Sequence, residues 1–299
     1  MSAEWQTQGE AGTRHAIASM RWIALHLGRT AAGIVLWPVA AYFFAVRPRQ
    51  RAAAADFLGR ILGRKPYAWE RLRHFYIFSR VSADRLYLLA GELDRLRIRV
   101  HGRELLERIS ASRRGSVVLS SHLGSFEATR AASLLDERVD LHVVIDRGVN
   151  PTFTHYLEKT APELAARVID ARSSHTAIAL RAAEVVARGG WIGLPADRRT
   201  AGAASVESRF LGEACRLPRG PFLLAAALAV PVVMATGLYL DGGYELYFEE
   251  LPVHGQAGRN ERDATVARLA TEFARRLERY ARMAPMNWFN FYDFWDHES

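Results

Sequence analysis

The segment Ser120–Arg130 (SSHLGSFEATR) holds the residues whose types and spacing best suit chemistry. His122 comes shortly after an apolar run typical of a buried strand, and Glu127 comes five positions later. In open α/β sheets, functional side chains collect where strands end. Five residues along one helix put two side chains about 140° apart, so this pair can meet only if His122 precedes the helix. Gly124 and Ser125 favour such a turn, and Ser125 is suited to cap the helix that follows.

This arrangement predicts a general base. Glu127 would accept a hydrogen bond from one imidazole nitrogen, which sets the tautomer and favours the imidazolium. The other nitrogen of His122 would take a proton from a substrate hydroxyl, so that the substrate supplies the nucleophile. The spacing is equally compatible with a structural histidine at the start of a helix and a solvent-exposed Glu127.

The elements around this segment alternate between short β-branched runs and helical patterns. Predicted strands cover residues 97–100, 116–120, 141–145, 167–169 and 191–194. Predicted helices cover residues 125–135, 152–159 and 177–187, and a long amphipathic helix covers 263–282. Residues 232–240 and 244–251 form a predicted hairpin around Asp241-Gly-Gly. This alternation predicts an α/β fold with a central, largely parallel sheet flanked by helices.

Residues 1–92 have helical patterns instead, with apolar spacings of three and four in residues 52–62 and 69–89. Residues 31–46 form a 16-residue run without charge between Arg29 and Arg47. The run is shorter than the roughly 20 residues that span a bilayer, and its aromatic residues and flanking arginines suit a helix at the membrane interface. A buried core helix is the alternative. We therefore expect a membrane-associating helical region at 1–92 and an α/β catalytic domain at 93–299.

The charge distribution is uneven. The chain has 299 residues and a net charge of +8; up to Arg114 it has 19 Arg and one Lys against nine Asp and Glu, and afterwards 19 Arg and one Lys against 23 acids. A basic first part suits docking to an anionic partner such as acidic lipid headgroups, an acidic carrier protein or nucleic acid, or it is simply a solvated surface. The single cysteine, Cys215, excludes an intrachain disulfide.

Several motifs are absent from the sequence. There is no HExxH, cysteine cluster or carboxylate cage for a metal, no GxxxxGK[ST] or GxGxxG for a nucleotide, and no GxSxG for a serine hydrolase. No RNA-recognition or zinc-finger signature accompanies the arginines. We therefore expect no bound cofactor, no metal and no nucleic-acid partner.

The H-x4-E at a strand end resembles the H-x4-D/E signature of the lysophospholipid acyltransferase superfamily. The wider context is similar to its bacterial branch, the late acyltransferases of lipid A biosynthesis. Further similar segments occur in order, and the similarity spans residues 22–295. They are residues 146–151 (DRGVNP), 190–198 (GWIGLPADR), 210–212 (FLG), 219–222 (RGPF) and 229–233 (AVPVV).

The resemblance implies a glycerol-3-phosphate acyltransferase-like fold and an enzyme that uses a thioester of acyl carrier protein or coenzyme A. The acceptor would be lipid-like, at the cytoplasmic face of the bacterial inner membrane. His122 and Glu127 would be the catalytic pair. The implied residues for substrate binding and oxyanion stabilisation are Arg147, Asn150, Asp197, Arg198, Gly124 and Ser125.

The C-terminal segment departs from the lipid A enzymes. Those usually close with a Trp and a basic cluster, whereas residues 287–295 (NWFNFYDFW) are aromatic without Arg or Lys. The segment is closer to acyltransferases of aryl polyene or related pigment pathways. Aromatic stripes of this kind also cover cores or rest on membranes. Two other functions stay open: a thioester or ester hydrolase, and a non-catalytic basic protein of the membrane surface.

Overall fold

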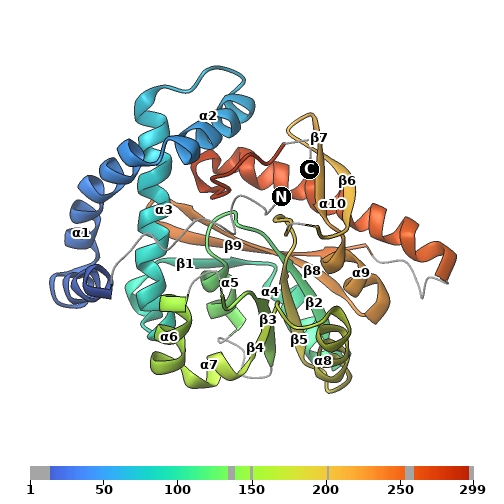
Figure 1. Cartoon of the computed structure of the whole chain (residues 1–299). Coiled ribbons are helices and arrows are strands. Elements are labelled where there is room, and N and C mark those ends of the chain that lie inside the picture. The colour runs from blue at the N-terminus through green and yellow to red at the C-terminus, as the bar shows by residue number, and fades with distance from the viewer. Residues whose placement is uncertain (1–13, 134–138, 149–150, 201, 253–258, 296–299) are drawn as a thin grey trace.

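The computed structural model describes residues 14–133, 139–148, 151–200, 202–252 and 259–295 (Figure 1). A seven-stranded sheet has the order β1-β9-β8-β2-β5-β3-β4, and every neighbouring pair is parallel except β8 and β9. Its strands are β1 (Ile98–His101), β2 (Ser116–Ser120), β3 (Leu141–Ile145), β4 (Val168–Asp170), β5 (Trp191–Pro195), β8 (Val232–Leu240) and β9 (Gly243–Leu251). The prediction of an α/β fold with a largely parallel sheet is confirmed.

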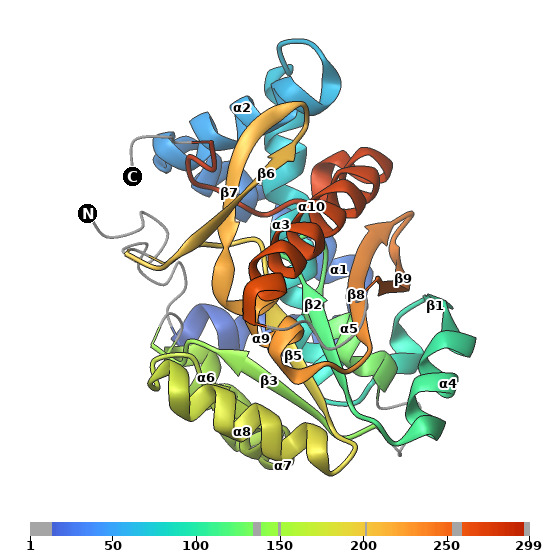
Figure 2. The same ribbon diagram turned by 90° about the vertical axis from the view of Figure 1, so that its right-hand side faces the viewer.

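The helices flank the sheet on both faces. They are α1 (Arg14–Val46), α2 (Pro48–Leu62), α3 (Ala68–Leu89), α4 (Arg103–Ser112), α5 (Phe126–Ser133), α6 (Pro151–Thr160), α7 (Pro162–Ala166), α8 (His175–Ala187), α9 (Arg219–Leu228) and α10 (Arg259–Met283). A separate antiparallel hairpin, β6 (Ser205–Phe210) and β7 (Glu213–Pro218), packs beside α10 (Figure 2). The sequence patterns did not predict this hairpin, α4 or α7.

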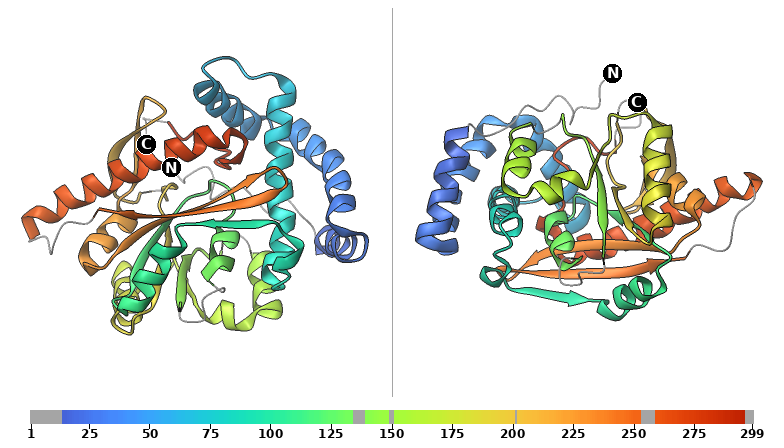
Figure 3. Two further views of the ribbon diagram at one scale, coloured as in Figure 1. Left: turned by 180° about the vertical axis from the view of Figure 1, so that it is seen from behind. Right: turned by 90° about the horizontal axis from the view of Figure 1, so that it is seen from below.

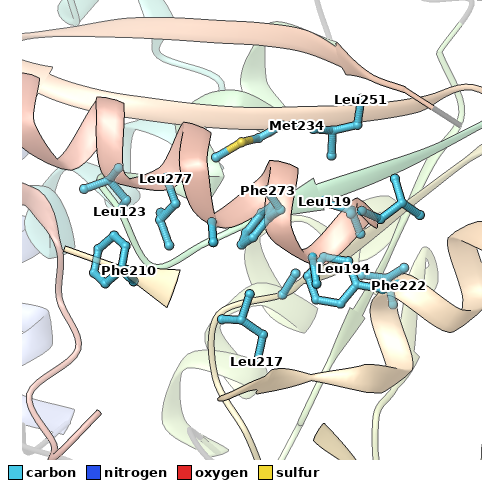
Figure 4. Close-up of a cluster of buried hydrophobic side chains, with 14 of the residues drawn as sticks. Leu119, Leu123, Leu194, Phe210, Leu217, Phe222, Met234, Leu251, Phe273 and Leu277 are labelled. Atoms are coloured by element: carbon cyan, nitrogen blue, oxygen red, sulfur yellow. The ribbon is translucent and has the colours of Figure 1, made fainter. Parts of the chain in front are cut away.

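The hydrophobic core has two parts, one on each face of the sheet. All five residues of β2 are buried, and because side chains alternate along a strand, Leu119 joins one part and Val118 the other. The first part lies under α8, α9 and α10, where Leu119, Phe222 and Phe273 approach one another (Figure 4). The second lies under α3, α4 and α5 (Figure 3).

The first 92 residues share these core clusters. Phe57 and Leu58 of α2 belong to the first cluster, and Val81 and Tyr87 of α3 belong to the second. The predicted boundary at residue 92 falls between α3, which ends at Leu89, and β1, which starts at Ile98.

Helix α1 is the apolar N-terminal element expected from the sequence. It bends at Gly28, where the backbone leaves the helical region (φ 83°, ψ 174°). The stretch His26–Val46 is long and apolar enough to cross a membrane by length and composition alone. About a fifth of its most apolar window (22%) is buried within the protein.

The aromatic C-terminal segment covers the core. Trp288, Phe289, Phe294 and Trp295 are all buried, and Trp288 packs against the ring of Phe57 at 4.8 Å. The segment thus joins α2 to the sheet, which agrees with the core-covering alternative.

Candidate active site

His122 and Asp197 meet at the carboxyl ends of two neighbouring parallel strands. Ser120 of β2 is paired with Pro195 of β5, and each of the two functional residues lies two positions beyond that pair. Nδ1 of His122 lies 2.8 Å from Oδ1 of Asp197, and the backbone N–H of His122 donates to Oδ2 at 2.9 Å. The Asp197 side chain is fully buried, whereas that of His122 is 33% exposed. Solvent therefore reaches the imidazole but not the carboxylate.

Two side chains from the C-terminal segment complete the surroundings of Asp197. The indole Nε1–H of Trp288 and the amide Nδ2–H of Asn290 both donate to Oδ2, each at 3.2 Å. Burial by itself raises the pKa of Asp197, but the His122 imidazole and the Arg198 guanidinium together hold that pKa below its usual value. An ionised Asp197 accepts the Nδ1–H of His122, which leaves the lone pair on Nε2.

The surroundings favour the neutral form of the His122 imidazole. Burial lowers its pKa most, the positive charge of Arg198 lowers it further, and Asp197 opposes both. The pKa lies below the ordinary value of 6.5. A neutral imidazole with its lone pair on Nε2 is the form that a general base requires.

Arg198 is held by the same C-terminal segment. Its Nε–H donates to Oδ1 of Asn290 at 2.6 Å, and its Nη2 donates to the carbonyl of Phe289 at 2.7 Å. The Asn290 amide thus bridges Asp197 and Arg198. The backbone N–H of Phe289 donates to the carbonyl of His122 at 2.9 Å, so the segment also holds the turn that carries the imidazole.

Glu127 is not the carboxylate that holds Nδ1 of His122, and the predicted hydrogen bond between them is wrong. Its Oε1 pairs with Nε of Arg85 at 3.1 Å, and its Oε2 accepts from Oγ of Ser125 at 3.4 Å. The physical reason is strand pairing. The end of β5 lies directly beside the end of β2, whereas the first turn of α5 directs Glu127 toward Arg85 on α3.

Gly124 and Ser125 build the turn and not the binding surface that the resemblance implied. The N–H of Gly124 donates to the carbonyl of Asn287, and the N–H of Ser125 donates to that of Gly237, both at 2.8 Å. These two amides are therefore already occupied and do not serve an oxyanion. Oγ of Ser125 accepts from the N–H of Ala128 at 3.1 Å, which confirms the predicted helix cap.

Arg147 points away from the site. Its Nη2 donates to the carbonyls of Ala165 and Val168 at 3.1 and 3.3 Å, and its Nη1 lies 3.5 Å from Oε1 of Glu158. These partners belong to α6, α7 and the edge strand β4, and β3 and β5 separate that edge from β2. The predicted role of Arg147 at the oxyanion is therefore corrected to a structural one. Asn150 lies outside the described residues.

Three contributors to the site were not predicted from the sequence. Arg85 of α3 is near enough for its charge to lower the pKa of His122, and nothing in its local spacing indicates this. The sequence indicated Trp288 and Asn290 only weakly, through the polar Asn residues that interrupt an otherwise aromatic segment. Among the residues that the structure describes, no three His, Cys, Asp or Glu side chains are placed to hold a metal ion together.

Comparison with protein-family models found no match, and a search of curated proteins found no relative. The fold and the site define the class of this chain in structural terms. It is an α/β protein with a mostly parallel sheet flanked by helices and one N-terminal apolar helix, and an Asp–His pair lies at the ends of two adjacent strands.

Proposed function

We propose that this protein is an acyltransferase that moves an acyl chain from a thioester of acyl carrier protein or coenzyme A to a hydroxyl or amine of a lipid-like acceptor. The observation that carries the proposal is the hydrogen bond of 2.8 Å between the buried Asp197 and Nδ1 of a partly exposed His122. This is a base and its orienting carboxylate, and the acceptor supplies the nucleophile.

The reaction needs one base and one source of positive charge. Nε2 of His122 takes the proton of the acceptor group, whose oxygen or nitrogen attacks the thioester carbonyl. The tetrahedral intermediate then collapses, the carbon–sulfur bond breaks, and the thiolate receives the proton from the imidazolium. Arg85 and Arg198 both act electrostatically on His122, and they supply positive charge near the developing oxyanion. Glu127 holds Arg85 in place.

The serines near His122 favour transfer to an external acceptor over a serine hydrolase. Oγ of Ser120 donates to the carbonyl of Leu194 at 3.3 Å, and Oγ of Ser121 accepts from the N–H of Leu123 at 3.4 Å. Oγ of Ser125 caps α5. Oγ of Ser125 also donates to Glu127, and among the described residues no hydrogen bond joins any of these three hydroxyls to the imidazole.

The finer assignment follows the sequence resemblance. We place the chain in the glycerol-3-phosphate acyltransferase-like fold, beside the late acyltransferases of lipid A biosynthesis and closer to the aryl polyene subgroup. The basic first part suits an acidic carrier protein and the anionic cytoplasmic face of the bacterial inner membrane. The aromatic C-terminal segment, without Arg or Lys, argues against a bisphosphorylated acceptor.

The test is acyl transfer from an acyl-carrier thioester, followed by mass spectrometry with and without a lipid acceptor. We expect His122→Ala to lower product formation by at least about 100-fold, because general base catalysis contributes on that order. His101→Ala is the matched control, since it removes an exposed imidazole paired with Glu245 on another edge of the sheet.

Three outcomes would overturn the proposal. Normal product from a folded His122→Ala variant removes the catalytic assignment. Thioester cleavage that does not depend on an acceptor identifies a hydrolase. Membrane binding without any turnover in the wild-type protein supports the non-catalytic alternative.

A further inference from the structure

Exposed apolar side chains concentrate in one part of the molecule. Of the twelve large hydrophobic residues that are exposed among the described residues, ten lie between Trp22 and Phe78. The other two, Leu180 and Met283, are isolated on α8 and α10. An exposed apolar surface of this density marks an interaction site, whereas isolated apolar residues on a surface are ordinary.

One face of helix α1 packs against the rest of the protein, and the opposite face is exposed. Ala32, Leu36 and Ala40 are buried at four-residue spacing, and this face packs on α3. On the outward face Ile34 is 68% exposed and Tyr42 is 61% exposed. Between Arg29 and Arg47 there is no charged residue. Helix α1 is outermost, with α3 between it and the sheet (Figures 1 and 3).

An ion pair fixes α1 to the body of the protein. Nε and Nη2 of Arg29 donate to the two carboxylate oxygens of Asp84 at 3.0 and 2.6 Å, and Asp84 is buried. The hydroxyl of Tyr244 also donates to Asp84 at 3.0 Å. Nη1 of Arg80 donates to the backbone carbonyl of Arg29 at 2.6 Å. If α1 left this position to cross a bilayer, a buried carboxylate would lose its cation, which is strongly unfavourable.

The last turns of α1 lie beside the start of α3. Helices α1 and α3 run antiparallel, because Arg29 meets Asp84 at one end and the ring of Phe44 packs edge to face with that of Phe75 at the other. The far end of α1 therefore lies near the start of α3, where the Trp69 side chain is 58% exposed.

Cations lie at that same end. Arg47 and Arg49 follow the last turn of α1, and the exposed Tyr67 precedes α3. Amphipathic aromatic rings beside arginines are typical of the boundary between anionic headgroups and acyl chains.

We infer that the outward face of α1 lies on a single leaflet of a bilayer that contains anionic lipid, with the helix along the surface and its ends on the same side. Its apolar side chains enter the leaflet, while Arg29 stays paired with Asp84. The inference rests on the proposed function only in stating that the protein binds its lipid acceptor at this membrane surface.

The first experiment measures on which side of the membrane the two ends of the helix lie. Single cysteines replace Leu27 and Ala52, which are exposed on either side of the uncharged run. The native Cys215 is buried and its thiol pKa is raised to about 12 by burial, so it reacts slowly. Each variant is added to preformed vesicles of phosphatidylcholine and phosphatidylglycerol and treated with a membrane-impermeant maleimide. We expect both cysteines to react without detergent. Reaction of only one of them until the vesicles are dissolved would establish a spanning helix and overturn the inference.

The second experiment measures vesicle flotation of the double variant Ile34→Asp and Tyr42→Asp. We expect the bound fraction to fall at least about tenfold, because two charges would enter the apolar leaflet. Leu180→Asp is the matched control, with a side chain that is 62% exposed on α8, and its flotation should equal that of the wild type. Thermal melts confirm that each variant is folded.

Equal flotation of the double variant and the control would show that the outward face of α1 does not bind the membrane. A wild-type dimer in solution that dissociates in the double variant would show that a second copy occupies this face instead. Flotation of His122→Ala should match the wild type. A failure of the acyltransferase proposal therefore appears only in the transfer assay, and a failure of the docking inference appears only in flotation and labelling.

Discussion

The pKa of the His122 imidazole reflects opposing influences from its neighbours. Burial and Arg198 disfavour the added proton, whereas Asp197 favours it. In the proposed reaction, this balance favours the neutral imidazole and keeps a partner for the charge that would form during proton transfer. Asn290 connects the two opposing groups, because its amide contacts both Asp197 and Arg198.

The residue-scale prediction concerns the pH dependence of kcat/KM. A base must be deprotonated, so the proposed activity should fall on acidification with a midpoint below 6.5. Asp197→Asn removes the interaction that raises the His122 pKa, so the midpoint should move lower still. The maximal kcat/KM, reached above this midpoint, should also fall by roughly 10²- to 10⁴-fold, because the tautomer of His122 is no longer fixed.

Asp140→Asn is the control for this measurement. Asp140 pairs with the imidazole of His142 at 3.1 Å near the start of β3, away from the site. Its profile should match the wild type. A midpoint above 6.5, or an equal effect of both substitutions, would contradict the assigned roles.

At the scale of elements, the turn between β2 and α5 depends on close backbone contact with β8. Gly124 has a φ of 74°, and a Cβ at this position would overlap the carbonyl oxygen of Gly237. The N–H of Ser125 donates to that same carbonyl at 2.8 Å. The position of His122 at the start of this turn therefore relies on two glycines that are distant in sequence, Gly124 in the turn and Gly237 in β8.

We predict that Gly124→Ala lowers the free energy of unfolding by more than about 3 kcal/mol. The left-handed conformation costs an alanine roughly 1–2 kcal/mol, and the overlap with backbone atoms adds to this. Gly212→Ala is the control, because its φ is 84° but its Cβ would meet open space. It should lose only the roughly 1–2 kcal/mol of the left-handed conformation. Urea unfolding measures both, and equal losses would show that the contact with Gly237 is unimportant.

At the scale of the whole molecule, His74 joins α3 to the C-terminal segment. It is fully buried, its Nε2–H donates to the carbonyl of Trp288 at 2.9 Å, and its ring lies against Phe291 at 4.8 Å. Burial lowers its pKa from 6.5 to about 4. The unfolded chain therefore binds a proton between pH 6.5 and about 4 that the folded chain does not.

This difference predicts a loss of stability in acid. Below pH 6.5 the unfolded state takes up the proton and is favoured, and the loss stops growing near pH 4, where folded His74 also titrates. Between pH 7 and pH 5 the contribution is about 2 kcal/mol. His74→Gln keeps an N–H donor and does not titrate, so its unfolding free energy should fall by about 2 kcal/mol less than that of the wild type over this range. Denaturant unfolding at both pH values tests this, and identical pH slopes would exclude His74 as the cause.

Local patterns in the sequence determined much of the fold. The alternation of apolar residues located the strands from β1 to β5, the hairpin of β8 and β9, and the helices α5, α8 and α10, mostly within a few residues of their ends. The sequence also identified His122 at a strand end, the cap at Ser125 and the uncharged run within α1. These features depend on neighbours within one or two turns of chain, which is the range over which periodicity and capping act.

Only the tertiary structure decided which groups meet. Asp197 reaches His122 across 75 positions of sequence because β5 pairs with β2, and Trp288 reaches Asp197 across 91. Arg29 meets Asp84 across 55 positions because α1 packs antiparallel on α3. Local patterns in the sequence indicate whether a segment is a helix or a strand, but not which other element packs beside it. The spacing of His122 and Glu127 therefore predicted a nearby carboxylate, while strand order brought a different one to the imidazole.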